Sequence, residues 1–170
     1  PKIVVQNAAG VCSVEEDTRL LAQVCAEAAP AGGRILDLGT GTGYVAIYLA
    51  RRGFRADASD VSPRALALAA RNIAANQAPA NLYRSHLLAN VGGPYDVIAF
   101  NPPMNPGETE LTRLITSFLR RHRRVANVLM KLFDRLLDRS RIDFLVEFLR
   151  QAPAHLAPGG CIVLELTRLE

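Results

Sequence analysis

Two short motifs in this sequence combine a flexible backbone with side chains that could bind or orient a ligand. The first, DLGTGTG at 37–43, places three glycines at alternate positions, where a chain can turn tightly and approach a ligand without a Cβ in the way. The dinucleotide fingerprint GxGxxG would need a glycine where Tyr44 stands. The motif therefore indicates a nucleotide-like ligand and disfavours a pyrophosphate-binding loop.

An acidic residue, Asp60, follows the glycine motif by about twenty residues. It ends a short segment that predicts a strand, and a carboxylate there can accept hydrogen bonds from both hydroxyls of a ribose. Asp57 is a competing candidate, but strand alternation favours Asp60. We place Val61, the next residue, in the same predicted site.

The second motif, Asn101-Pro102-Pro103-Met104, follows another predicted strand. The nitrogen of an amide or aromatic amine is a poor nucleophile because its lone pair is delocalised. The side-chain oxygen of Asn101 and the carbonyl of Pro102 could accept the two N–H hydrogens and aim the nitrogen at an electrophile. The two prolines restrict the backbone, so these acceptors would be fixed before the substrate arrives. We predict a catalytic loop at these four residues, although Asn-Pro-Pro alone is also common in turns.

The elements that must position both motifs alternate between strand and helix. Capping-box residues at Ser13 and a Ser62-Pro63 pair mark two helix starts. Apolar spacing predicts helices at 14–29, 44–52 and 63–76 and strands at 34–38, 54–60, 81–85, 95–100 and 161–166. This order predicts an α/β fold, a Rossmann-like, doubly wound and mainly parallel sheet of about five strands with flanking helices. Its ligand site should lie at the carboxyl ends of the strands.

The bulk composition fits one domain without a membrane anchor. With 170 residues, 49% of them hydrophobic, the chain can bury one core, so we expect a single domain over 1–170. No apolar run reaches the roughly 18–20 residues of a membrane-spanning helix, and the first residues lack a signal-peptide pattern. A cytoplasmic protein is therefore expected. The three cysteines form no CxxC pair, and no metal site is predicted.

A basic helical insertion is expected at about 108–156. Its cluster RRHRR contains Arg120, Arg121, Arg123 and Arg124, which could clamp RNA phosphates or an acidic protein surface. Apolar residues recur at helical spacing through the same segment, so the arginines could equally form the solvated face of amphipathic helices. Both interpretations stay open at the level of sequence.

The order of these motifs resembles that of class I S-adenosylmethionine-dependent methyltransferases, whose first strand leads into acid-x-Gly-x-Gly-x-Gly and whose second ends in an acidic residue. The resemblance implies S-adenosylmethionine as the cofactor, with Asp37 orienting the loop and the methionine moiety. His86 stands where the family often has an acidic residue facing the adenine amine; a neutral imidazole could accept that bond, or His86 is an exposed loop residue. The implied cofactor-binding residues are Asp37, Gly39, Thr40, Gly41, Gly43, Asp60, Val61, His86 and Asn101.

The segment YDVIAFNPP at 95–103 is similar to the HemK-like enzymes of the small-domain methyltransferase family, as is Glu16-Asp17-Thr18. This similarity implies an N-methyltransferase acting on a planar amide or amine nitrogen. A protein glutamine is preferred as the methyl acceptor, and an adenine or guanine of RNA or DNA comes next. Met104 is a departure, because relatives usually have Tyr or Phe there to pad the planar group.

Two alternatives follow from the departures. The sequence shows no C-terminal strand hairpin, which class I enzymes usually add after the fifth strand, so that strand would need cover from the basic helices or from a second chain in a homodimer. A non-catalytic module that binds nucleic acid or a protein through the basic helices is the alternative function. Met104, His86 and the missing hairpin favour it, whereas the retained acidic, glycine and asparagine residues favour the enzyme.

Overall fold

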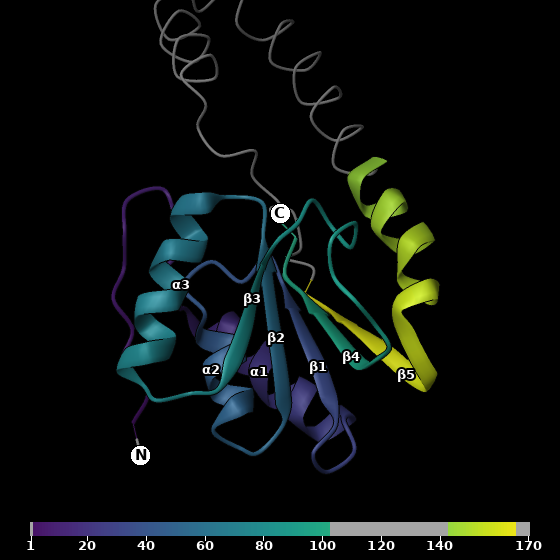
Figure 1. The fold of residues 1–170 in the computed structure, drawn as a ribbon, viewed down its shortest axis with the longest axis horizontal. Helices are drawn as coiled ribbons and strands as arrows, with labels where there is room; N and C mark the ends of the chain where they lie inside the picture. Colours follow the sequence, from purple (N-terminus) through teal and green to yellow (C-terminus); the bar gives the residue numbers. More distant parts are fainter. Residues whose placement is uncertain (1, 103–142, 166–170) are drawn as a thin grey trace, which may run out of the picture. The chain divides into compact units, whose positions relative to one another are not determined.

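The computed structural model of the chain describes residues 2–102 and 143–165 (Figure 1). It divides into two units, residues 1–102 with 148–170, and residues 103–147. The first unit carries both motifs. Most of the expected basic insertion, including Arg120, Arg121, Arg123 and Arg124, lies outside the described residues, so that prediction is not tested. Within the second unit, residues 143–147 are helical.

Five parallel strands form one sheet in the first unit, in the order β3-β2-β1-β4-β5 (Figure 1). The strands are β1 (Arg34–Leu38), β2 (Arg55–Asp60), β3 (Ala80–Arg84), β4 (Tyr95–Phe100) and β5 (Leu156–Leu164). The chain proceeds outward from β1 to β3 and then crosses back to β4. This reversal beside β1 is where an open parallel sheet forms a ligand crevice at its carboxyl edge. The predicted fold class is confirmed.

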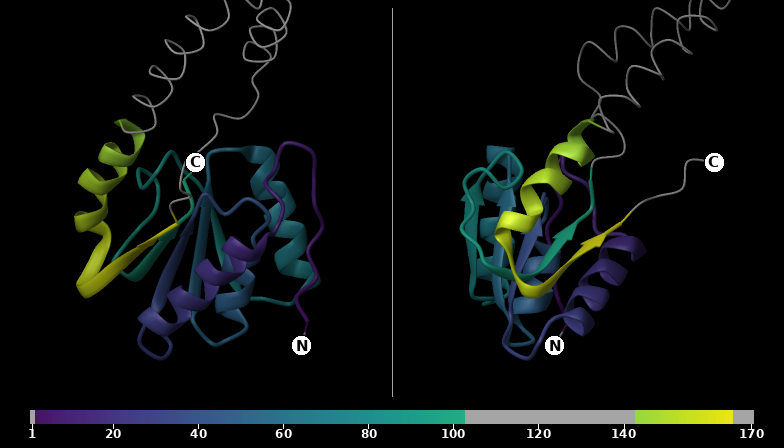
Figure 2. Two further views of the ribbon diagram at one scale, coloured as in Figure 1. Left: turned by 180° about the vertical axis from the view of Figure 1, so that it is seen from behind. Right: turned by 90° about the vertical axis from the view of Figure 1, so that its right-hand side faces the viewer.

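Helix α2 (Tyr44–Ala50) packs against both α1 (Glu16–Ala28) and α3 (Pro63–Ala75), and α1 and α2 cover the sheet face seen in the left view of Figure 2. Val97 and Ala99 of β4 join these helices in the main apolar core. Successive strand residues point to opposite faces, so Phe100 faces the other way. Its ring lies 4.8 Å from that of Phe148, which places the helical residues 148–151 on the second face.

Two details of the sequence prediction are wrong. Helix α1 begins after Glu15, whose backbone N–H donates to the Thr18 hydroxyl at 3.5 Å, rather than after a cap at Ser13. Strand β5 begins at Leu156, not at 161, so residues 157–160 belong to the strand. The pairing with β4 is irregular at this point, and glycine is needed at 160 because a Cβ there would lie only 2.8 Å from the Tyr95 carbonyl oxygen.

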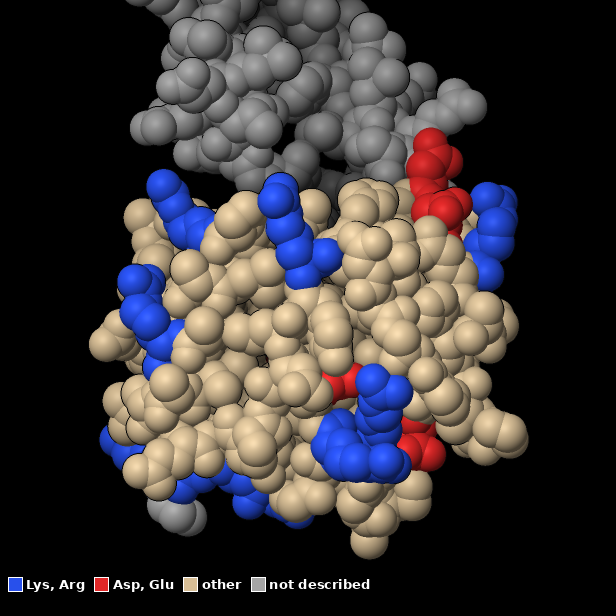
Figure 3. All heavy atoms as spheres, viewed as in Figure 1, with Lys and Arg blue, Asp and Glu red and all other residues tan. Residues whose placement is uncertain are grey.

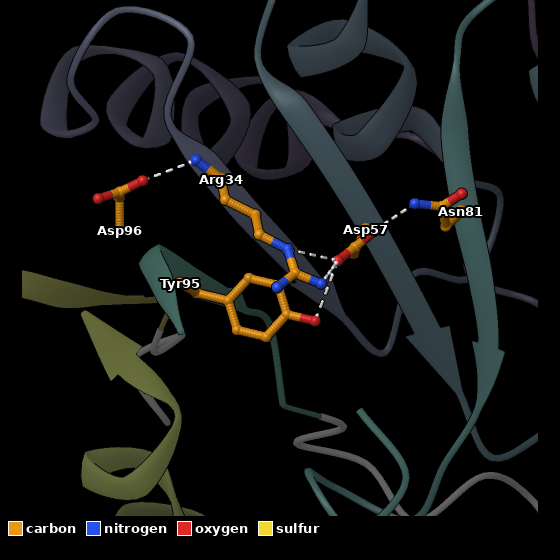
Figure 4. A network of polar contacts seen from close by, with 5 residues as sticks. All are labelled: Arg34, Asp57, Asn81, Tyr95 and Asp96. Atoms are coloured by element: carbon orange, nitrogen blue, oxygen red, sulfur yellow. Dashed lines mark hydrogen bonds and ion pairs between the residues drawn. The ribbon is translucent and has the colours of Figure 1, made fainter. Parts of the chain in front are cut away.

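A buried polar network joins four strands toward their amino-terminal ends (Figure 4). Asp57, only 2% exposed, accepts hydrogen bonds from the Arg34 guanidinium at 2.7 and 3.0 Å, the Tyr95 hydroxyl at 3.1 Å and the Asn81 amide at 2.8 Å. Asp96 accepts the Arg34 backbone N–H at 2.7 Å. Asp57 is therefore engaged away from the strand ends, which agrees with the choice of Asp60 as the ribose candidate.

Among the described residues, no helix is both long enough and apolar enough to cross a membrane.

The network predicts a graded loss of stability. Asp57→Ala leaves the Arg34 charge and two further donors without their acceptor, and we expect the free energy of unfolding to fall by about 3 kcal/mol. Tyr95→Phe removes one hydroxyl bond and should cost about 1 kcal/mol. Urea denaturation of both variants measures the difference, and equal small losses would show that the network does not hold the strands together.

Candidate functional site

The carboxyl ends of β1, β2 and β4 bring the predicted site residues to one edge of the sheet. Leu38 at the end of β1 pairs with Ser59 on one side and Phe100 on the other, so the three strands end nearly level. The Ser59 carbonyl accepts the backbone N–H groups of Gly39 and Thr40 at 2.8 and 2.9 Å, which ties the glycine loop to β2. The sequence motifs are thus neighbours in space.

The glycine loop depends on backbone conformations that favour glycine. Gly39, Gly41 and Gly43 have φ values of +71°, +55° and +83°. Gly43 is also the N-cap of α2, and a Cβ there would lie 3.2 Å from Cα and Cβ of Ala69 in α3. Gly39 has an exposed backbone and lies beside the Phe100 ring, 3.6 Å from the position of a Cβ. The loop is therefore closely packed at its end and open where it leaves β1.

Asp37 lies buried beneath this loop, with 4% of its surface exposed. Its Oδ2 accepts hydrogen bonds from the Thr40 hydroxyl and from the Ala46 backbone N–H, the latter at 3.2 Å. Burial raises the pKa of Asp37 to about 6, against the lowering effect of these two bonds, and the charge of nearby Asp60 adds to the increase. The structure thus places two acidic side chains close together at the loop.

Asp60 receives backbone donors on both oxygens. Oδ2 accepts the Gly41 N–H at 3.1 Å, and Oδ1 accepts the Ser62 N–H at 2.9 Å. Val61, the next residue, is 58% exposed. The Asp60 carbonyl accepts the N–H of Ser85, so the exposed His86 follows β3 at this same edge. These residues follow the ends of β2 and β3, which lie on the same side of β1.

Asn101 and Pro102 follow β4 at the same edge, with Asn101 exposed and Pro102 buried. The predicted catalytic residues Pro103 and Met104 lie outside the described residues. The basic cluster predicted for a phosphate or acidic partner also lies outside them. On the face shown in Figure 3, the described Lys and Arg side chains form several small groups rather than one continuous patch, and some of them lie beside Asp or Glu.

Sequence reasoning missed Glu165, which follows β5. Its backbone N–H donates to the Phe100 carbonyl at 3.0 Å, immediately before Asn101. Burial, followed by a hydrogen bond with Asp17 and the charge of Asp17, raises the pKa of Glu165 to about 7. The signal in the sequence is an acidic residue that interrupts the apolar run after Cys161, as Asp60 ends β2.

Within residues 2–102 and 143–165, no group of three His, Cys, Asp or Glu side chains is arranged to hold a metal ion.

Comparison with known families decides the class of protein. The model of the family described as "Methyltransferase small domain" matches residues 2–129. The chain belongs to this family. The match confirms the resemblance seen in the sequence, and it covers the glycine loop, Asp60 and Asn101 within one family segment.

Two curated relatives illustrate the range within the family. A release factor glutamine methyltransferase of Lactococcus lactis is 40% identical over 90 residues, covering 52% of this chain and 33% of the relative. A ribosomal RNA small subunit methyltransferase C of Chromohalobacter salexigens is 30% identical over 153 residues, covering 89% of this chain and 37% of the relative. The chain therefore spans about a third of the length of either protein.

A solved structure supports the fold independently. A methyltransferase from Pyrococcus furiosus superposes with a TM-score of 0.65 over 96% of this chain and 68% of its own, at 21% identity. At that identity the likeness shows the fold alone.

The glycine loop predicts a difference between two alanine variants. Gly43 and Gly53 have similar φ values, +83° and +87°, but a Cβ meets Ala69 at Gly43 and nothing within 4 Å at Gly53. Gly53→Ala should cost only the backbone strain, about 1–2 kcal/mol. Gly43→Ala should cost about 1–3 kcal/mol more because the helices must separate. Thermal or urea unfolding measures both, and equal losses would refute the close packing of α2 on α3.

Asp37 predicts a pH dependence of stability. Because its folded pKa of about 6 lies above the ordinary aspartate pKa of 3.8, the folded state holds a proton that the unfolded state has lost between these values. The contribution to stability is present below about pH 4 and is lost as the pH rises through about 6. The stability of Asp37→Asn relative to wild type should therefore increase over this window by about 3 kcal/mol. A difference that is constant from pH 4 to 7 would contradict the raised pKa.

Proposed function

We propose that this chain binds S-adenosylmethionine at the edge formed by β1, β2 and β4 and transfers its methyl group to a planar amide or amine nitrogen. The observation that carries the proposal is that a family member brings its glycine loop, Asp60 and Asn101 to three neighbouring strand ends. When bound, S-adenosylmethionine supplies an electrophilic methyl group on a positively charged sulfur.

The residues at this edge fit such a ligand. Asp37 is a buried carboxyl whose hydrogen-bond donors, Thr40 and Ala46, are uncharged, so a cationic ligand would lower its raised pKa. Asp60 presents a carboxylate beside the glycine backbone for ribose hydroxyls, and exposed Val61 offers apolar surface for a base. We assign Gly39, Gly41 and Gly43 to the close approach of the backbone, and His86 to the adenine side.

Asn101 is the proposed positioning group for the methyl acceptor. Its side-chain oxygen and the Pro102 carbonyl accept the two N–H hydrogens of the target, which directs the nitrogen lone pair toward the methyl group. Buried Pro102 restricts the backbone that carries these two acceptors. The hydrogen bond from the Glu165 N–H to the Phe100 carbonyl holds the residue before Asn101 beside the end of β5. The acceptor groups thus need no reorganisation when the substrate arrives.

A protein glutamine is our preferred methyl acceptor. The support is the match to the release factor glutamine methyltransferase of Lactococcus lactis, which has the higher identity of the two relatives described above. The longer but weaker match to an enzyme of ribosomal RNA favours a nucleic-acid base as the second candidate. Both acceptors present a planar nitrogen bearing two hydrogens, so the same Asn101 and Pro102 acceptors serve either one.

Substitution of Asn101 and Asp60 should separate catalysis from cofactor binding. Asn101→Ala should lower turnover about a hundredfold or more and leave the affinity for S-adenosylhomocysteine nearly unchanged, because it removes one transition-state acceptor. Asn101→Asp keeps an acceptor and should retain more activity than the alanine variant. Asp60→Ala, the matched control, should weaken binding by about 1.5–3 kcal/mol. Calorimetry and methyl-transfer rates measure the two effects.

The acceptor is found by transfer of a tritiated methyl group to a cell extract that is then separated into protein and nucleic acid. We expect label in protein, released as N5-methylglutamine after proteolysis. Label confined to RNA would overturn the glutamine assignment and keep the methyltransferase. An Asn101→Ala variant as active as wild type on the labelled acceptor would refute the role of that loop.

A further inference from the structure

The amino-terminal segment 3–11 runs along helix α3 toward the glycine loop (Figure 1), and we call it the strap. Two asparagines hold it through bonds to its backbone: Asn72 of α3, and Asn76, the residue that caps the carboxyl end of that helix. Asn72 Oδ1 accepts the Gln6 N–H at 2.8 Å and its Nδ2 donates to the Gln6 carbonyl at 3.1 Å. Asn76 makes the same pair of bonds with Val4, at 3.1 and 2.6 Å. Each side-chain amide therefore pairs with one strap residue as a neighbouring strand would.

The two spacings match for a geometric reason. Residues four apart in a helix are separated by about 6 Å along its axis. Residues two apart in an extended chain are separated by about 6.6 Å. Asn72 and the C-cap residue Asn76, four positions apart, can therefore bond Gln6 and Val4 together, and their side-chain amides pair with the strap backbone as a neighbouring strand would.

Asn72 makes one contact that Asn76 does not. Its Nδ2 also donates to the backbone carbonyl of Thr42 at 2.8 Å, and the residue is only 1% exposed. Thr42 lies between Gly41 and Gly43 of the glycine loop. One buried carboxamide thus bonds the strap, through Gln6, and the loop, through Thr42.

The far end of the strap reaches the same loop. A Cβ on Gly41 would lie 3.6 Å from Cγ1 of Val11, so the strap packs directly against the loop backbone. The Arg64 guanidinium donates to the Ala9 carbonyl at 3.4 Å, which fixes this end to the start of α3. The strap and the glycine loop are therefore in contact at one point and joined through Asn72 at another.

We propose that Asn72 is a positioning residue that couples docking of the strap on α3 to the shape of the glycine loop, and so to binding of the cofactor. A buried amide that loses one of its partners must satisfy its remaining groups elsewhere or pay for their desolvation. Release of the strap therefore destabilises the Asn72 position that holds Thr42. The effect on ligand affinity rests on the proposed function, the binding of S-adenosylmethionine. The coupling between the strap and the glycine loop does not depend on it.

The test compares variants that remove different hydrogen bonds between Asn72, the strap and the glycine loop. Asn72→Ala removes both contacts, and Gln6→Pro removes only the N–H that Asn72 accepts. Gln6→Ala keeps that N–H, and Ile73→Val trims the buried neighbour of Asn72 without touching a polar contact. The measurements are the Kd of S-adenosylhomocysteine by calorimetry, hydrogen exchange of the amides at 39–43, and thermal unfolding.

We expect Asn72→Ala to raise the Kd at least tenfold and Gln6→Pro about fivefold, with faster exchange in the glycine loop for both. Gln6→Ala and Ile73→Val should stay within twofold of wild type. The inference is overturned if Gln6→Pro frees the strap, seen as faster exchange at residues 3–11, and the loop amides exchange as in wild type. If Asn72→Ala does not fold, Gln6→Pro still decides. If wild type does not bind the ligand, the proposed cofactor fails, and the exchange data alone decide the coupling.

Discussion

The parallel pairing of β1 with β2 on one side and β4 on the other is the constraint on which the rest of the structure depends. Strand β1 is central in the sheet, and all its residues after Arg34 are buried. Its register sets Leu38 level with Ser59 and with Phe100, so the segments that follow the three strands emerge side by side. This register brings an acidic residue, a glycine loop and an asparagine that are far apart in the chain to one edge of the sheet.

Two buried aspartates show how the halves of the sheet differ. Asp57, toward the amino-terminal ends, lies in an ion pair with Arg34 at 2.7 Å and accepts further donors from two other strands. Asp37, at the carboxyl end, has neutral donors and a raised pKa. The first carboxylate is compensated within the protein and holds the strands together. The second gains its compensation, under the proposed function, from a cationic ligand.

The edge of the site is assembled from segments that are separated by most of the chain. The strap contacts Gly41 through Val11, and the first turn of α1 brings Asp17 to Glu165 at the end of β5. The Glu165 N–H in turn holds the Phe100 carbonyl at the start of the Asn101 loop. The strap therefore contacts the glycine loop directly, and α1 is connected through Glu165 to the residue before Asn101.

The sequence by itself determined the α/β fold, the strand and helix order and the glycine, Asp60 and Asn101 motifs, because local periodicity and turn chemistry act over a few residues. It misplaced the start of β5, since the irregular pairing with Tyr95 that lets Gly160 stay in the strand is a contact between strands. Only the tertiary structure decided that Asn72 joins the strap to Thr42, that Glu165 meets Asp17, and that Asp57 pairs with Arg34. These contacts link residues at least 23 positions apart, and a side-chain bond across such a distance leaves no repeating pattern in the sequence.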